Sequence, residues 1–319
     1  MQSAKHPGCN HSSDFQYDLY SATFIIILIP GLLANIAALW VLCSYINKKN
    51  KAIIFMINLT LADLAHVLSL PLRIFYYIHH IWPFGKSMCL LCFYLKYLNM
   101  YASIVFLTII SVQRYVFTTN PFKAKDWKRR YDVAVSIVVW IVVGSACLPF
   151  PLLRNNESSL KNNSCFADLG HRKVNVLTTM TMLTVAEMLG FIVPMAVIVY
   201  CSLKTRRELK SEALLSQNVK EKSKALRMVI MCAVVFFICF APYHVNFFFY
   251  MLIQLKMIEH CGVHNFVMTL HPYTLCLASI NCCLDPILYY FTASEFQNEV
   301  FKQSAVMRGR LMSTSFTKE

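Results

Sequence analysis

Charged residues and glycines are both scarce in this chain. Asp, Glu, Lys and Arg make up 14% of its 319 residues, whereas hydrophobic residues make up 57% and the mean hydropathy is +0.51. Soluble domains carry about 25% charged residues, so the composition excludes an ordinary soluble protein and predicts an integral membrane protein. None of the eight glycines belongs to a phosphate-binding loop, and no His, Cys or carboxylate set has metal-ligand spacing. No enzyme signature is present.

Seven long apolar runs fill most of the chain. A membrane-spanning helix needs about 20 predominantly apolar residues, and the prolines in or beside these runs are tolerated there as kinks. The fold class is therefore an all-α membrane protein: a seven-transmembrane helix bundle (21–291) between an N-terminal segment (1–20) and a C-terminal part (292–319). Residues 292–303 have the pattern of a short amphipathic helix on the membrane surface. The runs are 21–46, 53–78, 87–118, 131–153, 174–203, 224–254 and 264–290.

The third run carries polar residues on one stripe of an otherwise apolar helix. Lys96, Ser103 and Arg114 follow Cys89 at intervals of seven, seven and eleven residues, and Asn99 lies close beside the stripe. A helix from Cys89 to Arg114 would be about 37 Å long, enough to cross a bilayer. Ionisable groups at membrane depth almost always face a bundle interior or a wet cavity. We therefore expect this helix to be the axis of the bundle.

The basic residues predict how the chain is oriented. Of the 30 Lys and Arg, 20 fall within 48–51, 123–130, 204–227 and 302–318, which all lie on one side of the membrane. The positive-inside rule makes that side cytoplasmic and the N-terminus extracellular. This topology accounts for the net charge of +14 without nucleic-acid binding. Residues 1–20 have no basic region or cleavage site of a signal peptide, so cleavage is not expected.

The opposite side has the features of an extracellular surface. Three glycosylation sequons begin at Asn10, Asn156 and Asn162, all in segments predicted to be extracellular. Most of the thirteen cysteines lie inside the runs as small packing residues. An oxidising exterior permits two disulfides among the four that lie outside. Those four are Cys9, Cys89, Cys165 and Cys261.

Motifs at the ends of all seven runs resemble those of rhodopsin-like (class A) G-protein-coupled receptors. The resemblance covers residues 20–303 and implies a plasma-membrane receptor whose partners are heterotrimeric G proteins, arrestin and receptor kinases. It also implies a Cys89–Cys165 disulfide that holds the second extracellular loop over the ligand pocket, with Cys9 and Cys261 forming the second bridge. The motifs are Gly31–Asn35, Asn58–Asp63, Trp82–Gly85, Gln113–Tyr115, Trp140, Pro194, Tyr200, Phe236–Tyr243 and Asn281–Tyr289.

Three positions depart from the usual pattern of this family. Gln113 replaces the acid that normally holds the following Arg114 in an ion pair, so we expect a looser inactive state and raised basal activity. Phe240 replaces a tryptophan and Asp285 replaces an asparagine, as is typical of the purinergic and lysophospholipid branch. Within that branch the chain resembles the purinoceptor-like group associated with lysophosphatidylserine.

The expected ligand site is rich in basic residues. Lys96 stands where a receptor for an amine would have an aspartate, and Arg73, Arg154, His244 and His271 can converge on the same cavity. Several cationic donors with few carboxylates favour an anionic ligand that has a phosphate or carboxylate head. The alternative for Arg73 and Arg154 is that they extend to the lipid headgroups.

Three further residues are assigned to the ligand site. Glu187 is the one acid near this level, and it either pairs with a cation of the protein or binds the ammonium of a zwitterionic head. Tyr97 and Tyr101, four residues apart, share a helix face and need hydrogen-bond partners. The aromatic residues and methionines nearby suit an acyl chain, but such residues equally serve as packing.

A second polar cluster is expected deeper in the bundle. Two carboxylates at mid-membrane cannot stay charged and unpaired, and the resemblance implies that they bind a sodium ion, with Asp63 as its ligand, or share a proton. No other cofactor is expected. The alternative is a purely structural hydrogen-bond network. The cluster comprises Asn35, Asp63, Asn99, Ser103, Asn281 and Asp285.

The cytoplasmic ends of the helices carry the expected G-protein switch. The resemblance assigns it to Gln113, Arg114, Tyr115, Tyr200 and Tyr289. Helix six would swing outward about the kink at its proline to admit the G protein.

The sequence thus predicts a receptor for an extracellular anionic lysophospholipid, with lysophosphatidylserine as the expected ligand. The alternatives are a nucleotide (purinergic) receptor and an orphan receptor with high basal activity. A transporter or channel would need inverted repeats or paired broken helices, and the seven runs show none.

Overall fold

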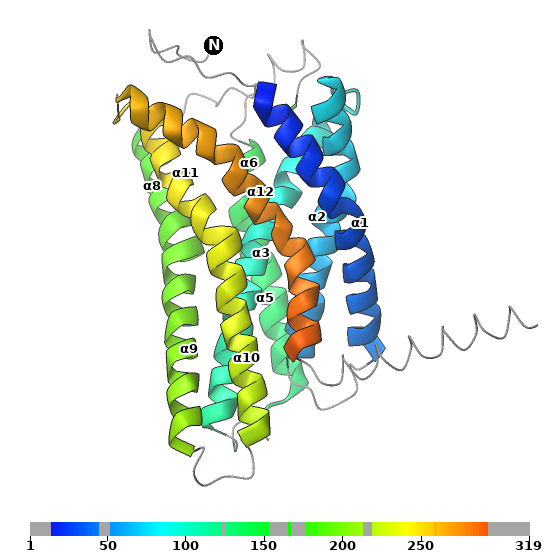
Figure 1. Cartoon of the computed structure of the whole chain (residues 1–319), viewed down its shortest axis with the longest axis vertical. Helices are drawn as coiled ribbons and strands as arrows, with labels where there is room; N and C mark the ends of the chain where they lie inside the picture. Colours follow the sequence, from blue (N-terminus) through cyan, green and yellow to red (C-terminus); the bar gives the residue numbers. More distant parts are fainter. Residues whose placement is uncertain are drawn as a thin grey trace, which may run out of the picture.

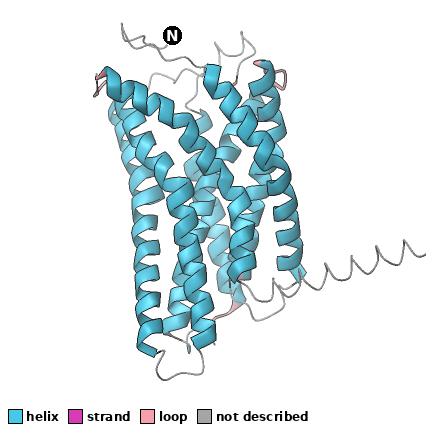
Figure 2. Ribbon diagram, viewed as in Figure 1, coloured by secondary structure: helices cyan, strands magenta, loops and turns pink. Residues whose placement is uncertain are grey.

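The structure is a computed structural model that describes residues 14–44, 52–120, 122, 126–152, 165–166, 176–212, 219–258 and 260–292. Within these residues the regular secondary structure is entirely helical (Figure 2). Seven helices of this described part are long and apolar enough to cross a membrane, which confirms the prediction of a seven-helix bundle. The described residues end at Thr292, so the expected surface helix and tail lie almost entirely outside them. Four further predicted site residues also lie outside the described residues: Cys9, Asn10, Asn156 and Asn162.

The helices alternate in direction across the bundle (Figure 1). The first, second, third, fourth and seventh spans correspond to α1, α2, α3, α5 and α12. The fifth is built from α8, η1 and α9, and the sixth from α10, η2 and α11. The elements are α1 (Asp14–Ser44), α2 (Ile53–His79), α3 (Gly85–Thr119), α5 (Arg129–Cys147), α6 (Pro149–Leu152), α8 (Val176–Glu187), η1 (Met188–Ile192), α9 (Val193–Glu212), α10 (Val219–Val235), η2 (Phe236–Phe240), α11 (Ala241–Gln254) and α12 (Cys261–Thr292).

Helix α3 is the axis of the bundle, as its polar stripe predicts. It contacts α2, α5, α6, α9 and α10 together with both η1 and η2. Asn99 and Ser103 are buried, as are the apolar residues Phe106 and Leu107 beside them. The polar residues of the stripe therefore face the interior, because other helices surround most of α3.

The outer surface of the bundle is apolar. On α1, Ile26, Ile29 and Leu33 are each more than 60% exposed. Their spacing of three and four residues places them on one face, while Phe24 and Ile27 of the same helix are buried in the core. Such a continuous exposed apolar face is what a lipid-facing helix presents.

In the described part of the chain two spans contain a π-helical turn, a feature not predicted from the sequence. η1 ends two residues before Pro194 and η2 ends two residues before Pro242. A proline has no backbone N–H and its ring clashes with the carbonyl four residues earlier, so a widened turn just before it accommodates the missing hydrogen bond. The prolines predict a kink, and the structure realises that kink as a π turn.

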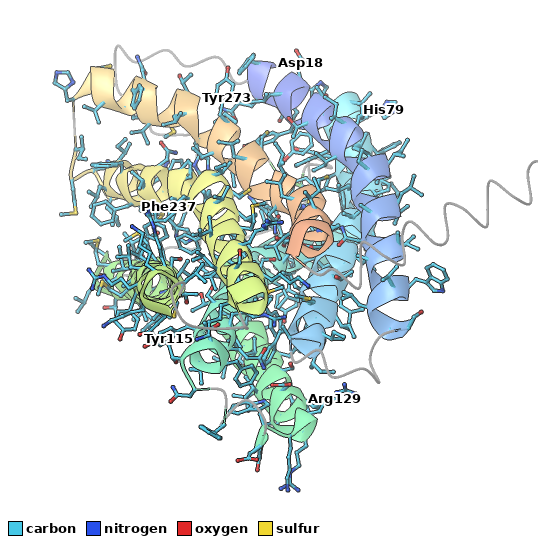
Figure 3. All side chains as sticks on the ribbon, turned by 60° about the horizontal axis from the view of Figure 1, so that its bottom comes forward. Asp18, His79, Tyr115, Arg129, Phe237 and Tyr273 are labelled. Carbon is cyan, nitrogen blue, oxygen red and sulfur yellow. A yellow bond between two sulfur atoms is a disulfide. The ribbon has the colours of Figure 1, made fainter. Side chains whose placement is uncertain are left out.

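The two ends of the bundle are chemically distinct, and we call them the disulfide end and the Arg114 end. The disulfide end holds the start of α1, the end of α2 (Figure 1) and the first turns of α3, which contain Cys89. The Arg114 end, which comes forward in Figure 3, holds Tyr115 and Arg129.

Candidate functional site

A disulfide covers the candidate site at one end of the bundle. Cys89 at the start of α3 is bonded to Cys165, with their Cα atoms 5.9 Å apart. The bond holds Phe166 against the aromatic rings of Tyr76, Tyr77 and Trp82, at centroid distances of 5.3 to 5.8 Å. These rings and the disulfide form one packed cluster at this end of the bundle, which we call the lid. Cys261 is also disulfide-bonded, and its expected pairing with Cys9 stays a prediction.

Arg73 lies directly beneath this lid. Its side chain is only 2% exposed, its Nη2 donates to the backbone carbonyl of Cys92, and its guanidinium lies over the ring of Phe166 at 5.2 Å. The alternative that Arg73 extends outward to lipid headgroups is therefore wrong. Its Nε remains buried without a hydrogen-bond partner among the described residues.

Lys96 lies deeper, on the neighbouring helix. Its ammonium is 5.2 Å from the ring centroid of Tyr97, and it is close enough to His66 and His271 to interact with both electrostatically. His271 in turn stacks on Tyr250 at a centroid distance of 4.4 Å. Residues from α2, α3, α11 and α12 thus meet around the lysine.

Glu187 is engaged by the protein itself. The Nδ1 atom of His244 lies 3.2 Å from its Oε1 and 3.3 Å from its Oε2. The imidazole therefore reaches both carboxyl oxygens through one ring nitrogen. His244 is fully buried, stacks on Phe191 of η1 at 4.8 Å and meets the edge of Tyr101 at 5.8 Å. Of the two alternatives for Glu187, the structure contains the pairing with a protein side chain.

The residues of the candidate ligand site share one chemical property, and we call them the basic layer. Each has a basic side chain, and all lie on the disulfide side of Asp63. Four of their nitrogens are buried with no hydrogen-bond partner in the described part of the chain: Arg73 Nε, His244 Nε2, and both ring nitrogens of His66. The basic layer comprises His66, Arg73, Lys96, His244 and His271.

The second cluster lies one helical turn further into the bundle, and we call it the acidic layer. Asn99 Nδ2 donates to Asp63 Oδ1 at 2.8 Å, and Asn281 Nδ2 donates to Ser103 Oγ at 3.2 Å. Asn35 Nδ2 donates to the carbonyl of Cys282 at 2.6 Å. These contacts bring α1, α2, α3 and α12 together. The acidic layer comprises Asn35, Asp63, Asn99, Ser103, Asn281 and Asp285.

The unpartnered atoms of the acidic layer are oxygens. Five have no hydrogen-bond partner among the residues that the structure describes: one each from Asn35, Asp63 and Asn281, and both carboxylate oxygens of Asp285. Asp63 and Asp285 are fully buried and lie within electrostatic range of each other. Buried carboxylates need a proton or a cation. The layer can therefore hold a positive charge, whereas the basic layer can hold a negative one.

Gln113 is hydrogen-bonded to a residue of another helix. Its Nε2 donates to Asp132 Oδ1 of α5 at 2.9 Å, and Trp127 Nε1 donates to the same oxygen at 2.7 Å. Arg114 donates from Nε to Met228 Sδ at 2.9 Å. The substitution that removes the acid beside Arg114 thus links α3 to α5 instead.

Two tyrosines also meet at the Arg114 end of the molecule. The rings of Tyr115 and Tyr200 meet edge to face at 5.8 Å (Figure 3 labels Tyr115). Tyr200 is half exposed. The backbone of Tyr289 belongs to α12, and its side chain lies outside the described part of the chain.

Comparison with known proteins identifies the family. The model of the rhodopsin family of seven-transmembrane receptors matches residues 34–289. The chain belongs to that family. It is a receptor rather than an enzyme, a multi-pass protein of the plasma membrane, and it couples to G proteins.

Relatives of the receptor fall in the branch that the motifs indicate. It is 59% identical to a human protein whose name describes it as a putative purinoceptor, over 96% of the chain and 90% of that protein. It is 47% identical to mouse "Probable G-protein coupled receptor 174" over 92% and 88%. It is 35% identical to mouse "Lysophosphatidic acid receptor 6" over 94% and 88%. The purinergic and lysophospholipid branch is thereby confirmed.

The structure brings together most of the residues assigned to the receptor's ligand site, namely Arg73, Lys96, Tyr97, Tyr101, Glu187, His244 and His271. Arg154 lies outside the described residues. Phe166 and His66 were not among the residues predicted from the sequence. His66 lies three residues after Asp63 and seven before Arg73, so its helical spacing was a usable signal. Phe166 had none beyond its position after Cys165.

Proposed function

We propose that the receptor responds to an extracellular lysophospholipid with an anionic head, and that lysophosphatidylserine is its ligand. The observation that carries the proposal is the buried, incompletely hydrogen-bonded Arg73 beneath Phe166. A buried guanidinium is stabilised by a bidentate phosphate or carboxylate, and Lys96 supplies a second positive charge nearby. In this proposal the disulfide end faces outward and the Arg114 end faces the G protein.

Aromatic and apolar side chains adjoin the charged groups, which supports a ligand that has an acyl chain. Lys96 lies against Tyr97, and His244 lies between Tyr101 and Phe191. One relative is named for lysophosphatidic acid, a phosphate-bearing lipid.

A nucleotide is the second candidate ligand, favoured by the name of the purinoceptor relative. Its polyphosphate needs a denser set of cations and no apolar partner. The described part of the basic layer has two strong cations, Arg73 and Lys96, and three histidines. We therefore favour the lipid.

A ligand panel tests the proposal. G-protein activation would be measured in lipid-stripped cells with lysophosphatidylserine, lysophosphatidic acid, lysophosphatidylcholine, ADP and UTP, on wild type and Lys96→Ala at equal surface expression. We expect activation by lysophosphatidylserine in wild type and a large loss in Lys96→Ala. A response confined to nucleotides, or equal potency in both receptors, would overturn it.

We also propose that the acidic layer holds a sodium ion. Oxygen is the atom that hard cations take as a ligand, and the five unpartnered oxygens in the described residues around Asp63 and Asp285 fit such an ion. An ion there would stabilise the arrangement of α1, α2, α3 and α12, and its loss would accompany activation. A proton shared by the two carboxyl groups is the alternative.

Arrestin and receptor kinases are proposed as further partners, on the grounds of family membership alone. Their contacts would fall on the Arg114 end and on residues 292–319, most of which lie outside the described chain.

A further inference from the structure

The packing of α2 against α3 determines what His66 faces. Asp63 accepts a hydrogen bond from Asn99, and Arg73 donates to Cys92 further toward the disulfide end. The helices run antiparallel, so each step toward that end goes up in number on α2 and down on α3. One turn from the Asp63–Asn99 contact therefore brings His66 level with Lys96.

His66 is a buried side chain with no described contact to explain its polarity. It is 1% exposed, and neither Nδ1 nor Nε2 has a hydrogen-bond partner among the described residues. Buried polar atoms are almost always hydrogen-bonded, and an orphaned one needs an explanation. The charged groups of the described chain that act on the ring are Arg73 and Lys96, both positive. The imidazole N–H is thus a donor without an acceptor, in a positively charged environment.

We propose that His66 and Lys96 together bind the carboxylate of the ligand's serine head, while Arg73 binds its phosphodiester. This inference rests on the proposed function and deepens it. The serine carboxylate and ammonium share the carbon furthest from the acyl chain, so a head held at Arg73 under the lid extends its carboxylate toward the deeper pair. An imidazole N–H and an ammonium then donate to its two oxygens.

The assignment makes His66 a specificity residue. A head with one anionic group, such as that of lysophosphatidic acid, satisfies Arg73 and leaves His66 without an acceptor. A site whose buried polar groups stay unpaired discriminates strongly against the ligand that lacks their partner. The receptor would thereby prefer a two-anion head over a one-anion head.

The test combines a change in the receptor with a change in the ligand. The variants are His66→Leu, which removes both nitrogens, and His66→Asn, which keeps an N–H donor. The ligands are lysophosphatidylserine and its serine methyl ester, in which the phosphodiester stays and the carboxylate is capped. Potency would be measured by G-protein activation and competition binding at matched surface expression. His79→Leu, at the exposed end of α2 (Figure 3), is the matched control.

We expect His66→Leu to lower the potency of lysophosphatidylserine about tenfold or more, in line with the loss of a hydrogen bond to a charged group. The potency of lysophosphatidylserine on His66→Asn should lie between its potency on His66→Leu and on wild type. The methyl ester should be weak on wild type and about equally weak on both variants, and His79→Leu should match wild type with each ligand.

Two outcomes would overturn the proposal. If His66→Leu weakens the ester as much as the parent lipid, the histidine supports the fold and does not read the carboxylate. If the ester is as potent as the parent on wild type, no carboxylate contact exists, and this holds even where a variant fails to reach the surface. Failure of the proposed function is distinguishable from both, because wild type would then respond to neither lipid.

Discussion

The basic and acidic layers lie one helical turn apart and have opposite chemical deficits. Among the described residues, every unpartnered atom of the basic layer is a nitrogen of Arg or His, and every one of the acidic layer is an oxygen of a carboxyl or amide group. On α2 the change from Asp63 to His66 takes three residues, about 4.5 Å along the axis. The asparagines of the acidic layer could have left amide nitrogens unpartnered as well, so the restriction to oxygens indicates a site for a cation.

The two layers also differ in what encloses them. The basic layer lies under a lid that a disulfide holds to α3. The acidic layer is enclosed by α1, α2, α3 and α12 and is tied together by amide groups. The first arrangement suits a ligand that exchanges with the exterior, and the second suits a small ion or proton that stabilises one packing of the helices.

Removing Arg73 should cause the largest loss of ligand potency. Arg73→Gln deletes the charge beneath the lid, and losing one member of a buried charge contact costs about 3 kcal/mol, or roughly 100-fold in potency. Arg73→Lys should be intermediate because it keeps the charge but loses the planar fork. Lipid-stimulated G-protein activation measures both.

The control for Arg73 removes the same charge at the same end of the bundle. Lys86→Gln lies at the exposed start of α3. We expect it to leave potency near that of wild type. A loss in Lys86→Gln as large as in Arg73→Gln would mean that the general positive field, rather than a contact, attracts the ligand.

Neutralising Asp63 should remove the effect of sodium on agonist affinity. In wild type, replacing sodium by choline in the medium should shift agonist affinity by about tenfold, since a bound ion and an agonist typically couple by about 1–3 kcal/mol. Asp63→Asn and Asp285→Asn should each abolish the shift. Radioligand competition in the two media measures it. If the layer is only a structural network, Asp63→Asn should lower surface expression, and replacing sodium should not shift agonist affinity even in wild type.

Gly190→Ala should disturb the basic layer through packing alone. A Cβ at this glycine of η1 would lie 2.6 Å from Cε1 of Tyr101, which itself contacts His244. Overpacking of this kind costs about 1–3 kcal/mol, so Tyr101 has to move. We expect a loss of ligand potency of about fivefold at matched surface expression, a change of about 1 kcal/mol.

Gly144→Ala provides the comparison for Gly190. Its Cβ would approach the hydroxyl of Tyr94 at 3.1 Å, on the side of α3 that faces α5 rather than the ligand site. Potency in Gly144→Ala should stay near that of wild type. Equal losses in both variants would show that bundle stability, and not the position of Tyr101, controls potency.

Residues that are costly in a membrane were predictable from the sequence, whereas their partners were not. Lys96, Arg73 and Asp63 are conspicuous because each is an ionisable residue in an apolar run. Pairing requires the register between helices, which single-run periodicity does not contain. Glu187 therefore had two alternatives until the structure brought it to His244, and the π turns were visible only as prolines.

Gln113 is the clearest case of a partner that the sequence could not specify. Its neutral side chain suggested a loosened Arg114, yet its amide joins Trp127 in donating to Asp132. The contact crosses from α3 to α5 over nineteen residues. The adjacent Arg114 therefore gave no indication that Gln113 is hydrogen-bonded to Asp132.

Introducing a negative charge at Gln113 should have the smallest effect, a modest change in basal signalling. Gln113→Asp places a carboxylate against that of Asp132, and losing this hydrogen bond costs about 1 kcal/mol. We expect α3 and α5 to separate more easily at the Arg114 end and basal G-protein signalling to rise about threefold, within that energy. The double variant Gln113→Asp with Asp132→Asn restores a donor and an acceptor, so its basal signalling should return toward wild type. A rise that persists in the double variant would show that loss of the hydrogen bond between positions 113 and 132 is not its cause.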